Sequence, residues 1–400
     1  MSEARKTALP GVERAILPGA TLGVMGGGQL GRMFVHAAQS LGYRTAVLDP
    51  DAASPAGLVS HHHIHADYLD ADGLGRLVTL ADAITTEFEN VPAAALQTLA
   101  DQRPVAPAAA AVAICQDRAE EKAHFGRAGV PCAPCAVIRS EADLAGVPDT
   151  LLPGILKTAR LGYDGKGQAG VATRAELAAA WLGMKHVPCV MEKRLPLELE
   201  LSVIVARRAD GQAVNFPVQQ NLHRDGILAV TQVPAPDVSV ELAQQAITRA
   251  HAIATELGYV GVLCVEFFVV RDAAGALALV ANEMAPRPHN SGHYTIDACD
   301  QSQFELQVRT MAGLPLTTPR LHSPAVMLNL LGDLWFDGSV ERTPAWEELL
   351  KLPGVHLHLY GKTSARPGRK MGHLNVTGTN AASVRATALQ ACALLGLAPY

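Results

Sequence analysis

Two glutamates, Glu266 and Glu283, are placed so that they could share a metal ion. Glu266 lies inside an apolar run over residues 260–270, and Glu283 ends the next apolar run, beyond a turn at 271–275. Runs rich in β-branched and aromatic residues favour strands, and strands joined by a short turn pair, so the two carboxylates should be neighbours. Buried carboxylates repel each other unless a cation separates them. Mg²⁺ shared with nucleotide phosphates is therefore the first hypothesis.

The segment after Glu283 carries groups suited to binding an anion. Arg287, His289 and Asn290 follow the carboxylate within seven residues. A guanidinium, an imidazole and an amide all donate hydrogen bonds to anionic oxygens. We expect this loop to lie beside the metal site and to hold an anionic substrate there.

A glycine-rich segment at residues 26–31 lies between a predicted strand and a predicted helix, and Asp49 ends the next strand about twenty residues later. This spacing matches the dinucleotide fingerprint, so NAD binding is one interpretation. Glycine-rich turns and helix N-terminal amides also bind other anions, so another anionic ligand is a second interpretation. A purely structural turn is the third.

A second glycine-rich segment, residues 162–168, follows a strand that carries Lys157. It lacks the Gly-Lys-Ser/Thr of a Walker A loop, but a flexible loop beside an ammonium group could close over the terminal phosphates of ATP. Tyr163 and Asp164 stand out in a loop otherwise built for small residues. The alternative is an ordinary hairpin.

Strand-end charges follow in an order that favours a nucleotide site. The strand that begins at Cys189 ends near Glu192, and the linker 192–195 could hold an adenine by backbone hydrogen bonds, while Glu200 could bind ribose hydroxyls. Each residue alone is unremarkable. Their position after Lys157 and before the metal-site glutamates gives them significance.

The densest basic cluster suits the 5′-phosphate of a ribonucleotide, because ammonium and guanidinium groups both bind phosphate. A solvated charged loop is the alternative. A nucleic-acid site is disfavoured, because few aromatic residues lie nearby to stack on bases and the chain has a net charge of −5. The cluster consists of Lys362, Arg366, Arg369 and Lys370.

The composition indicates a soluble, cytoplasmic protein of several domains. The chain has 400 residues, 49% of them hydrophobic, yet no apolar run approaches the roughly 20 residues that span a bilayer. The first twenty residues lack the apolar core of a secretory signal. Seven cysteines in mostly apolar contexts favour reduced thiols, and the pair Cys132 and Cys135 lacks the partners of a zinc site. The histidine run 61–65 is interpreted as a surface loop, with a metal site as the alternative.

Periodicity divides the chain into an α/β part, an α+β part with two lobes and a small β-rich part. Asp117 opens a helix that ends at Gly129, where a boundary is expected. Predicted strands are 22–26, 44–49, 83–86, 325–331, 356–360 and 373–376. Predicted helices are 29–40, one from near 92, 106–113, 117–129, 174–183, 238–257, 346–350 and one after 379.

The order of these residues resembles the ATP-grasp superfamily, in which two antiparallel lobes hold ATP between them. More narrowly, the chain resembles the family of N5-carboxyaminoimidazole ribonucleotide synthetases of purine biosynthesis. The match extends from about residue 20 to 380. The segments that carry it are 28–32, 162–168, 221–228, 285–293 and 366–373.

This resemblance implies a Rossmann-like domain, a two-lobed ATP-grasp domain and a small C-terminal β-rich domain. The implied boundaries are 1–19 for a variable extension, then 20–115, 116–313 and 314–400. The implied reaction uses ATP to phosphorylate bicarbonate and delivers the carboxyl group to the exocyclic amine of 5-aminoimidazole ribonucleotide. Mg²⁺, with Mn²⁺ as a substitute, and a homodimer are also implied, with neither nucleic acid nor membrane as a partner.

The resemblance assigns a role to each matched residue. The ATP-binding residues would be Arg118, Lys157, Gly162, Tyr163, Asp164, Gly165, Lys166, Gly167, Gln168, Glu192, Lys193, Arg194, Leu195, Glu200, His223, Asn282 and Glu283. The metal ligands would be Glu266 and Glu283. The aminoimidazole substrate would be held by Gln29, Leu30, Glu87, Tyr163, Asp164, Lys362, Arg369 and Lys370. Catalysis would involve Tyr163, Asp164, Lys362 and, near bicarbonate, Arg287, His289 and Asn290.

Other functions remain open at this point. A formate-dependent glycinamide ribonucleotide transformylase or a biotin carboxylase-like subunit would share the ATP-grasp fold. An NAD-dependent oxidoreductase would use the first glycine-rich segment, and a non-catalytic nucleotide-binding module would need damaged metal ligands. Lys166 departs from the family, in which arginine is more usual, so a bidentate contact at this position would be lost.

Overall fold

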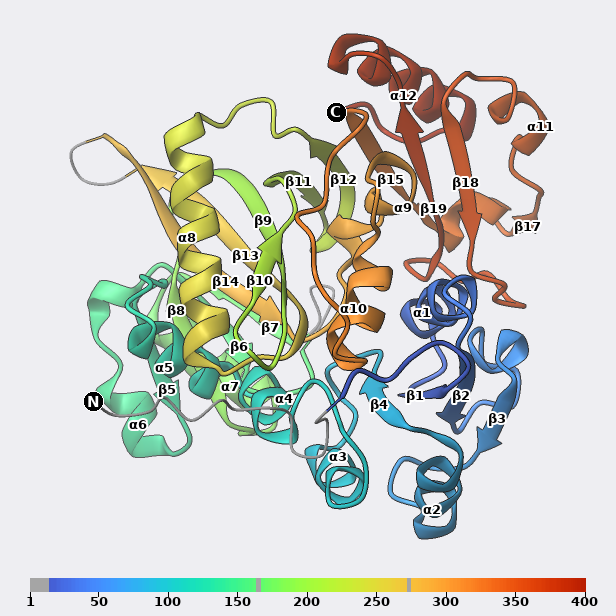
Figure 1. Ribbon diagram of the computed structural model, residues 1–400. Coiled ribbons are helices and arrows are strands. Elements are labelled where there is room, and N and C mark those ends of the chain that lie inside the picture. Colours follow the sequence, from blue (N-terminus) through green and yellow to red (C-terminus); the bar gives the residue numbers. More distant parts are fainter. Residues whose placement is uncertain (1–13, 163–166, 272–274) are drawn as a thin grey trace.

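The computed structural model of the chain describes residues 14–162, 167–271 and 275–400 (Figure 1). The predicted site residues Tyr163, Asp164, Gly165 and Lys166 and most of the predicted turn at 271–275 therefore lie outside the described residues. Within the described part, no helix is long and apolar enough to cross a membrane.

The N-terminal part is a parallel four-stranded sheet in the order β3-β2-β1-β4, as predicted for an α/β unit. Short apolar strands such as β1 are almost fully buried, because helices cover both faces of a parallel sheet. Its elements are β1 (Thr21–Met25), α1 (Gln29–Ser40), β2 (Arg44–Asp49), β3 (His62–His65), α2 (Ala71–Leu80), β4 (Ala83–Thr86) and α3 (Ala93–Ala100).

The interpretation of the histidine run as a loop is wrong. His62 to His65 form edge strand β3, since Ile64 is buried and anchors the run against β2. Histidines are tolerated there because an edge strand leaves alternate side chains at the surface. Across the residues that the structure describes, no His, Cys, Asp and Glu side chains group in threes that could hold a metal ion.

The helix predicted over 106–113 is displaced, and spans α4 (Ala109–Cys115) instead. Pro107 lacks an amide hydrogen and pushes the preceding residue towards an extended conformation. The helix therefore begins only after the proline, and continues through Ile114 and Cys115. Helix α5 (Arg118–Arg127) follows directly, capped by the side chain of Asp117, which accepts a hydrogen bond from the Ala119 amide.

The smaller lobe is an antiparallel sheet in the order β5-β8-β6-β7. Lys157 lies on β6 and Glu192 on β8, and these two strands pair directly. Apolar residues from the sheet and the covering helices form one buried cluster around Leu156, Leu177 and Trp181. The elements are β5 (Cys135–Ile138), α6 (Glu141–Gly146), β6 (Gly154–Thr158), β7 (Gln168–Val171), α7 (Arg174–Gly183) and β8 (Cys189–Lys193).

The larger sheet has nine strands in the order β14-β13-β9-β11-β12-β15-β19-β18, with β10 beside β9. The C-terminal strands β15, β19 and β18 extend this sheet through the pairing of β12 with β15. Its strands are β9 (Leu197–Arg207), β10 (Ala213–Asn215), β11 (Gln219–Arg224), β12 (Ile227–Val233), β13 (Gly261–Arg271), β14 (Leu277–Ala285), β15 (Ala325–Leu331), β18 (Val355–Leu359) and β19 (Lys370–Thr377).

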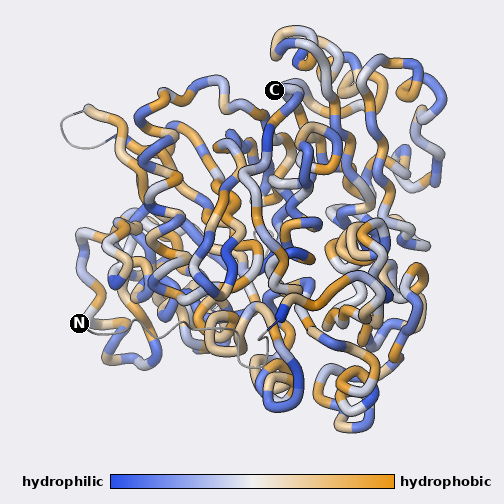
Figure 2. The backbone as a smooth tube through the Cα atoms, in the orientation of Figure 1, coloured by the Kyte–Doolittle hydropathy of each residue, from blue (hydrophilic) through white to orange (hydrophobic). Residues whose placement is uncertain are grey.

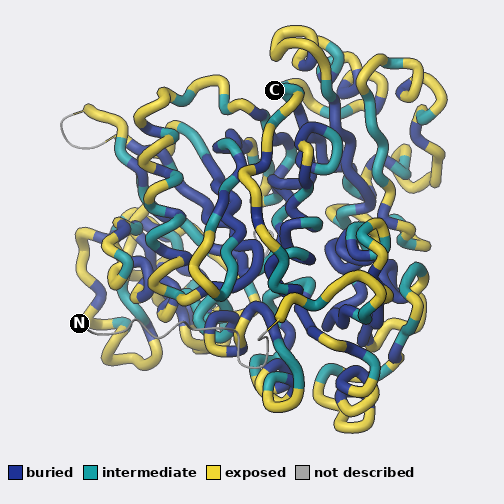
Figure 3. The backbone as a smooth tube through the Cα atoms, viewed as in Figure 1, coloured by how far each residue is buried: buried dark blue, intermediate teal, exposed yellow. Residues whose placement is uncertain are grey.

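Helices cover this sheet with their apolar faces. Helix α8 (Val240–Glu256) repeats Leu242, Ala246, Ala250 and Ile253 at three- and four-residue spacing, which places them on one face against β9 and β13. Figure 2 shows the resulting alternation of hydrophobic and hydrophilic residues along the chain, and Figure 3 shows that the central strands are buried. The helices that follow are α9 (Thr295–Ala298), α10 (Gln303–Met311), α11 (Trp346–Leu349) and α12 (Ala381–Leu395).

Helix α10 joins the N-terminal part to the larger lobe. Leu30 and Phe34 of α1 share a buried cluster with Phe304, Val308 and Met311 of α10. Large apolar side chains buried on both helices fix the two parts together. The glycine-rich segment before α1 and the loop after β14 are therefore held in a defined relation.

Candidate active site

The predicted pairing of the two glutamates is confirmed by the register of β13 and β14, which places Glu266 opposite Glu283. The register shifts immediately afterwards, since Phe267 pairs with Ala281, so Asn282 is the extra residue of a bulge. A bulge redirects the side chains around it. The amide of Asn282 and the carboxylate of Glu283 thus both lie near the end of β14, across from Glu266.

The donor atoms at this position fit a hard cation. Glu266 Oε1 and Asn282 Oδ1 are buried, and neither has a hydrogen-bond partner in the described residues. Burial, reinforced by Glu283, raises the pKa of Glu266 to about 7. A buried oxygen without a partner is costly, and a cation would satisfy both atoms. Mg²⁺ commonly takes one or two carboxylates and completes its shell with water and phosphate, so a third acidic ligand is not required.

The raised pKa predicts a pH-dependent metal effect. The pKa of Glu266 rises from 4.5 to about 7 on folding, so the folded protein loses stability relative to the unfolded chain as pH rises through this window. Mg²⁺ binds the ionised carboxylate, and its effect should grow as the proton leaves. We expect millimolar Mg²⁺ to raise the melting temperature more at about pH 8 than at about pH 6.

The control is Glu266→Gln, which cannot ionise and should show little difference between the two pH values. Glu121 is also buried with its pKa raised to about 7, so the stability of this variant without Mg²⁺ should still depend on pH. Equal Mg²⁺-induced shifts of the wild-type melting temperature at both pH values would exclude Glu266 as a metal ligand.

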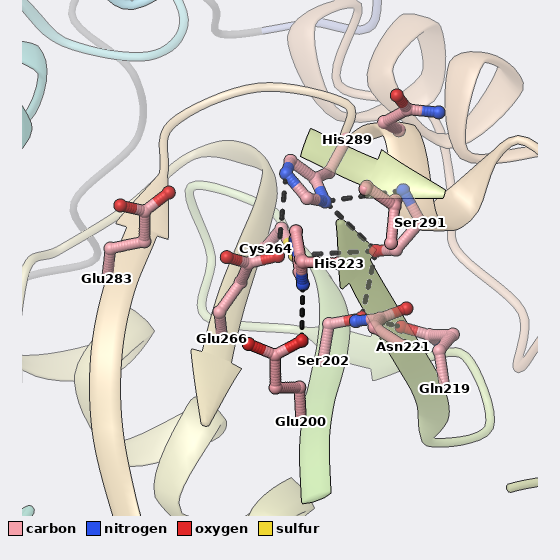
Figure 4. A network of polar contacts seen from close by, with 12 residues as sticks. Glu200, Ser202, Gln219, Asn221, His223, Cys264, Glu266, Glu283, His289 and Ser291 are labelled. Carbon is pink, nitrogen blue, oxygen red and sulfur yellow. Dashed lines mark hydrogen bonds and ion pairs between the residues drawn. The ribbon is translucent and has the colours of Figure 1, made fainter. Parts of the chain in front are cut away.

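A polar network surrounds Glu266 (Figure 4). His223 Nδ1 lies 2.5 Å from Glu200 Oε2, and His289 Nε2 lies 3.7 Å from Glu266 Oε1. Burial would lower the pKa of His223, but the hydrogen bond to Glu200 and the charges of Glu266, Glu200 and Glu283 together outweigh burial and raise the pKa. Burial, followed by Arg287, lowers the pKa of His289 well below its ordinary value. His289 is therefore a neutral imidazole at neutral pH.

Three cations approach the site from the smaller lobe and helix α5. Lys157 Nζ lies 3.0 Å from Glu192 Oε2, and Arg118 Nη1 lies 3.4 Å from Glu283 Oε2. Lys122, which the sequence analysis missed, lies 3.4 Å from Glu192 Oε1. Residues four apart share a helix face, so its spacing from Arg118 was the available signal.

The environment of Glu192 differs from that of the ordinary strand-end carboxylate expected from the sequence. Its side chain is 4% exposed and lies between two lysines, rather than at the surface. In the linker that follows, the Lys193 amide donates to Pro134 O at 2.9 Å and the Arg194 amide to Pro153 O at 3.1 Å. These bonds fix the linker, and adenine binding by Lys193, Arg194 or Leu195 stays a prediction.

The first glycine-rich segment binds carboxylates of its own chain. Glu87 accepts hydrogen bonds from the amides of Gly28 and Gly31, each at 2.9 Å, and Asp49 accepts one from Gly27 at 2.7 Å. Helix N-terminal amides favour an anion, and here the anion is internal. The arrangement argues against NAD, because Asp49 is already engaged. Gln29 and Leu30 follow at the start of α1, where Leu30 is buried.

The residues expected near bicarbonate all have partners. Arg287 forms an ion pair with Glu89, which holds the pKa of that carboxyl below its ordinary value despite burial. Asn290 and Asn329 exchange two hydrogen bonds, at 3.1 and 2.7 Å, through their buried side-chain amides. His289 Nδ1 lies 2.9 Å from Ser291 Oγ. Sequence analysis missed Glu89 and Asn329, because both come from distant elements.

The basic cluster lies next to the N-terminal part. Lys362 Nζ donates to Lys370 O at 2.6 Å, and Arg369 Nη1 donates to Ser364 O at 2.6 Å. Burial, followed by Arg369, lowers the pKa of Lys362 to about 8, while Glu87 opposes the shift. Glu87 and the basic cluster are thus close enough to interact, as one substrate site would require.

Two antiparallel lobes, with a lysine on the smaller sheet and two carboxylates on the larger, define an ATP-grasp protein. Family models agree: residues 123–304 match the ATP-grasp domain, 19–116 the ribonucleotide synthetase preATP-grasp domain, and 325–387 the phosphoribosylaminoimidazole carboxylase C-terminal domain. The chain is 45% identical to the N5-carboxyaminoimidazole ribonucleotide synthase of Brucella melitensis over 90% of this chain and 97% of that protein. The chain belongs to the N5-carboxyaminoimidazole ribonucleotide synthase family.

Solved structures extend this similarity. An ADP complex of an N5-carboxyaminoimidazole ribonucleotide synthetase matches with a TM-score of 0.87 and 39% identity, covering 95% of this chain and 98% of that one. The Aspergillus clavatus enzyme in complex with ADP and 5-aminoimidazole ribonucleotide matches with a TM-score of 0.85 and 31% identity, covering 94% and 98%. The fold is thus shared over nearly the whole of each chain.

Proposed function

We propose that this protein catalyses the ATP-dependent carboxylation of the exocyclic amine of 5-aminoimidazole ribonucleotide with bicarbonate. The products are N5-carboxyaminoimidazole ribonucleotide, ADP and phosphate, in purine biosynthesis. The observation that carries the proposal is the junction at the end of β14. There the Glu266 and Glu283 pair, with the unpartnered oxygens of Glu266 and Asn282, meets the loop that bears Arg287 and His289. Family membership supports it.

Phosphorylation of bicarbonate would require charge neutralisation around the γ-phosphate. Glu266 and Glu283 would hold Mg²⁺, which would supply a Lewis acid for the phosphate oxygens. Lys157 and Arg118 bring positive charge to the same oxygens from the smaller lobe and from α5. Bicarbonate attacks the γ-phosphorus, the bond to ADP breaks, and carboxyphosphate forms.

The loop after β14 would hold bicarbonate and carboxyphosphate. Arg287 offers a guanidinium fixed by Glu89, and neutral His289 can donate or accept a hydrogen bond without adding charge. Carboxyphosphate hydrolyses readily, so water must be excluded from the site. We propose Asn290 as a support of this loop through Asn329, in addition to any contact with bicarbonate.

The aminoimidazole ribonucleotide would lie between the basic cluster and Glu87. Lys362, Arg369 and Lys370 suit its 5′-phosphate, and Glu87, fixed by two glycine amides, is the nearby acceptor. Asp164 would orient the exocyclic amine, since an aspartate of ordinary pKa is a weak base at neutral pH.

We further propose the three domains 20–115, 116–313 and 314–400, a homodimeric assembly in the cytoplasm, and Mg²⁺ or Mn²⁺ as the activating ion. The support for the dimer and for the location is family membership. The support for the ion is the unpartnered oxygens of Glu266 and Asn282, together with Glu283 opposite Glu266.

The acceptor that stimulates ATP hydrolysis tests the proposed substrate. We expect strong stimulation by 5-aminoimidazole ribonucleotide with bicarbonate, and none by glycinamide ribonucleotide with formate. The opposite pattern would identify a transformylase instead. Enhanced nicotinamide fluorescence on addition of the protein to NADH would favour the oxidoreductase alternative.

A further inference from the structure

Lys122 of helix α5 lies where the two lobes meet. Its Nζ donates to Asn282 O at 2.9 Å, on the strand that carries Glu283, and lies 3.4 Å from Glu192 Oε1 in the smaller lobe. Lys157 Nζ lies 3.0 Å from the other oxygen of the same carboxylate. The side chains of Lys122 and Glu192 are each 4% exposed. One buried carboxylate is therefore shared by two buried lysines.

The second lysine becomes important if the ammonium of Lys157 moves from Glu192 to a nucleotide phosphate. If Lys157 were the sole partner of Glu192, its departure would leave a buried carboxylate without a counter-charge, which is strongly unfavourable. With Lys122 in place, Glu192 keeps an ammonium at close range. The pKa of Glu192 lies below its ordinary value despite burial, because the charges of Lys122 and Lys157 and the hydrogen bond from Lys157 all favour the ionised carboxylate.

Helix α5 holds Lys122 in place through contacts with consecutive residues of β14. Besides the bond from Lys122 to Asn282 O, Glu121 Oε1 accepts from the Met284 amide at 2.6 Å, and Arg118 pairs with Glu283. Moving Lys122 towards a ligand would disrupt this set. Lys122 is thus fixed beside Glu192.

We propose that Lys122 is a positioning residue that neutralises Glu192 and thereby makes the ammonium of Lys157 available to the nucleotide phosphates. This inference rests on the proposed function only for the binding of ATP. It assigns Lys122 no contact with substrate. Its effect should appear in nucleotide affinity, and should depend on the charge of Glu192.

The test measures binding of Mg²⁺ with AMPPNP, an ATP analogue that is not hydrolysed, by calorimetry on the full chain. Lys122→Met should weaken binding by on the order of tenfold or more. In the double variant, which also carries Glu192→Gln, most of this loss of affinity should be absent. Lys122→Arg, which keeps the charge, should retain most of the affinity. A control is Lys351→Met, at an exposed lysine paired with Glu348, which should bind as wild type does.

Two results would overturn the proposal. The first is that Lys122→Met binds the analogue with wild-type affinity. The second is that Lys122→Met weakens binding by the same factor in the Glu192→Gln background as in the wild type. If Lys122→Met does not fold, the comparison of the double variant with Glu192→Gln still decides, because we expect equal affinities. The assay contains neither bicarbonate nor aminoimidazole ribonucleotide, so an error in the assigned carboxylation would leave its outcome unaffected.

Discussion

Glu283→Gln should lower the rate of ATP turnover by about a thousandfold or more, because it removes a charge that we propose binds Mg²⁺ during phosphoryl transfer. Glutamine has nearly the same shape and can still accept the hydrogen bond from Arg118 at 3.4 Å. The fold should therefore be kept. Steady-state release of ADP, measured over a range of Mg²⁺ concentrations, checks this prediction.

A matched control is Glu256→Gln. Glu256 pairs with Arg127 at 3.9 Å in a half-exposed position, so the loss of its charge should leave turnover unchanged. Turnover of Glu283→Gln at the wild-type rate, with the same Mg²⁺ dependence, would refute the metal role of Glu283.

The double substitution Lys362→Ala with Arg369→Ala should raise the KM for 5-aminoimidazole ribonucleotide by about a hundredfold or more, because it removes two charge-assisted contacts that we propose for the 5′-phosphate. The KM for ATP should change little, since the nucleotide is expected between the lobes, with Lys157 and Glu192. Initial rates with each substrate varied in turn separate the two effects.

For this pair the control is Arg320→Ala, at an exposed arginine next to Asp300. Its kinetic constants should match those of the wild type. A rise in the KM for ATP alone after the double substitution would place the basic cluster at the nucleotide instead of the aminoimidazole substrate.

Periodicity in the sequence predicted most of the elements that build the site. The helices 29–40 and 174–183 and the strands 83–86 and 325–331 have the bounds that the structure shows. Their patterns are local, and glycine, proline or polar caps mark their ends. The prediction of a loop for the histidine run failed because composition says little about an edge strand that has a single buried residue, Ile64.

The pairing of the two glutamates was predictable because it depends on one hairpin. Glu266 and Glu283 belong to consecutive strands, so their meeting follows from local pairing. Lys122, Glu89 and Asn329 were missed because each acts through a partner from another element: Lys122 through Glu192, Glu89 through Arg287 and Asn329 through Asn290. Such pairs depend on packing between lobes, which a single sequence does not display.

The glycine-rich segment before α1 also has a partner that its sequence pattern does not identify. Its pattern predicted a turn whose amides can bind an anion. In the structure these amides donate hydrogen bonds to the carboxylate of Glu87, more than fifty residues away in sequence. An internal carboxylate and a bound phosphate satisfy the same amides. Only the tertiary structure distinguishes them.

The most direct test of the proposed reaction follows oxygen from bicarbonate. Incubation with ATP, Mg²⁺, 5-aminoimidazole ribonucleotide and ¹⁸O-labelled bicarbonate should yield phosphate that carries one ¹⁸O atom, because the bicarbonate oxygen that attacks phosphorus stays with the phosphate. Mass spectrometry of the released phosphate measures this transfer. Unlabelled phosphate, released at the same rate as ADP, would contradict the phosphorylation of bicarbonate at the Glu266 and Glu283 site.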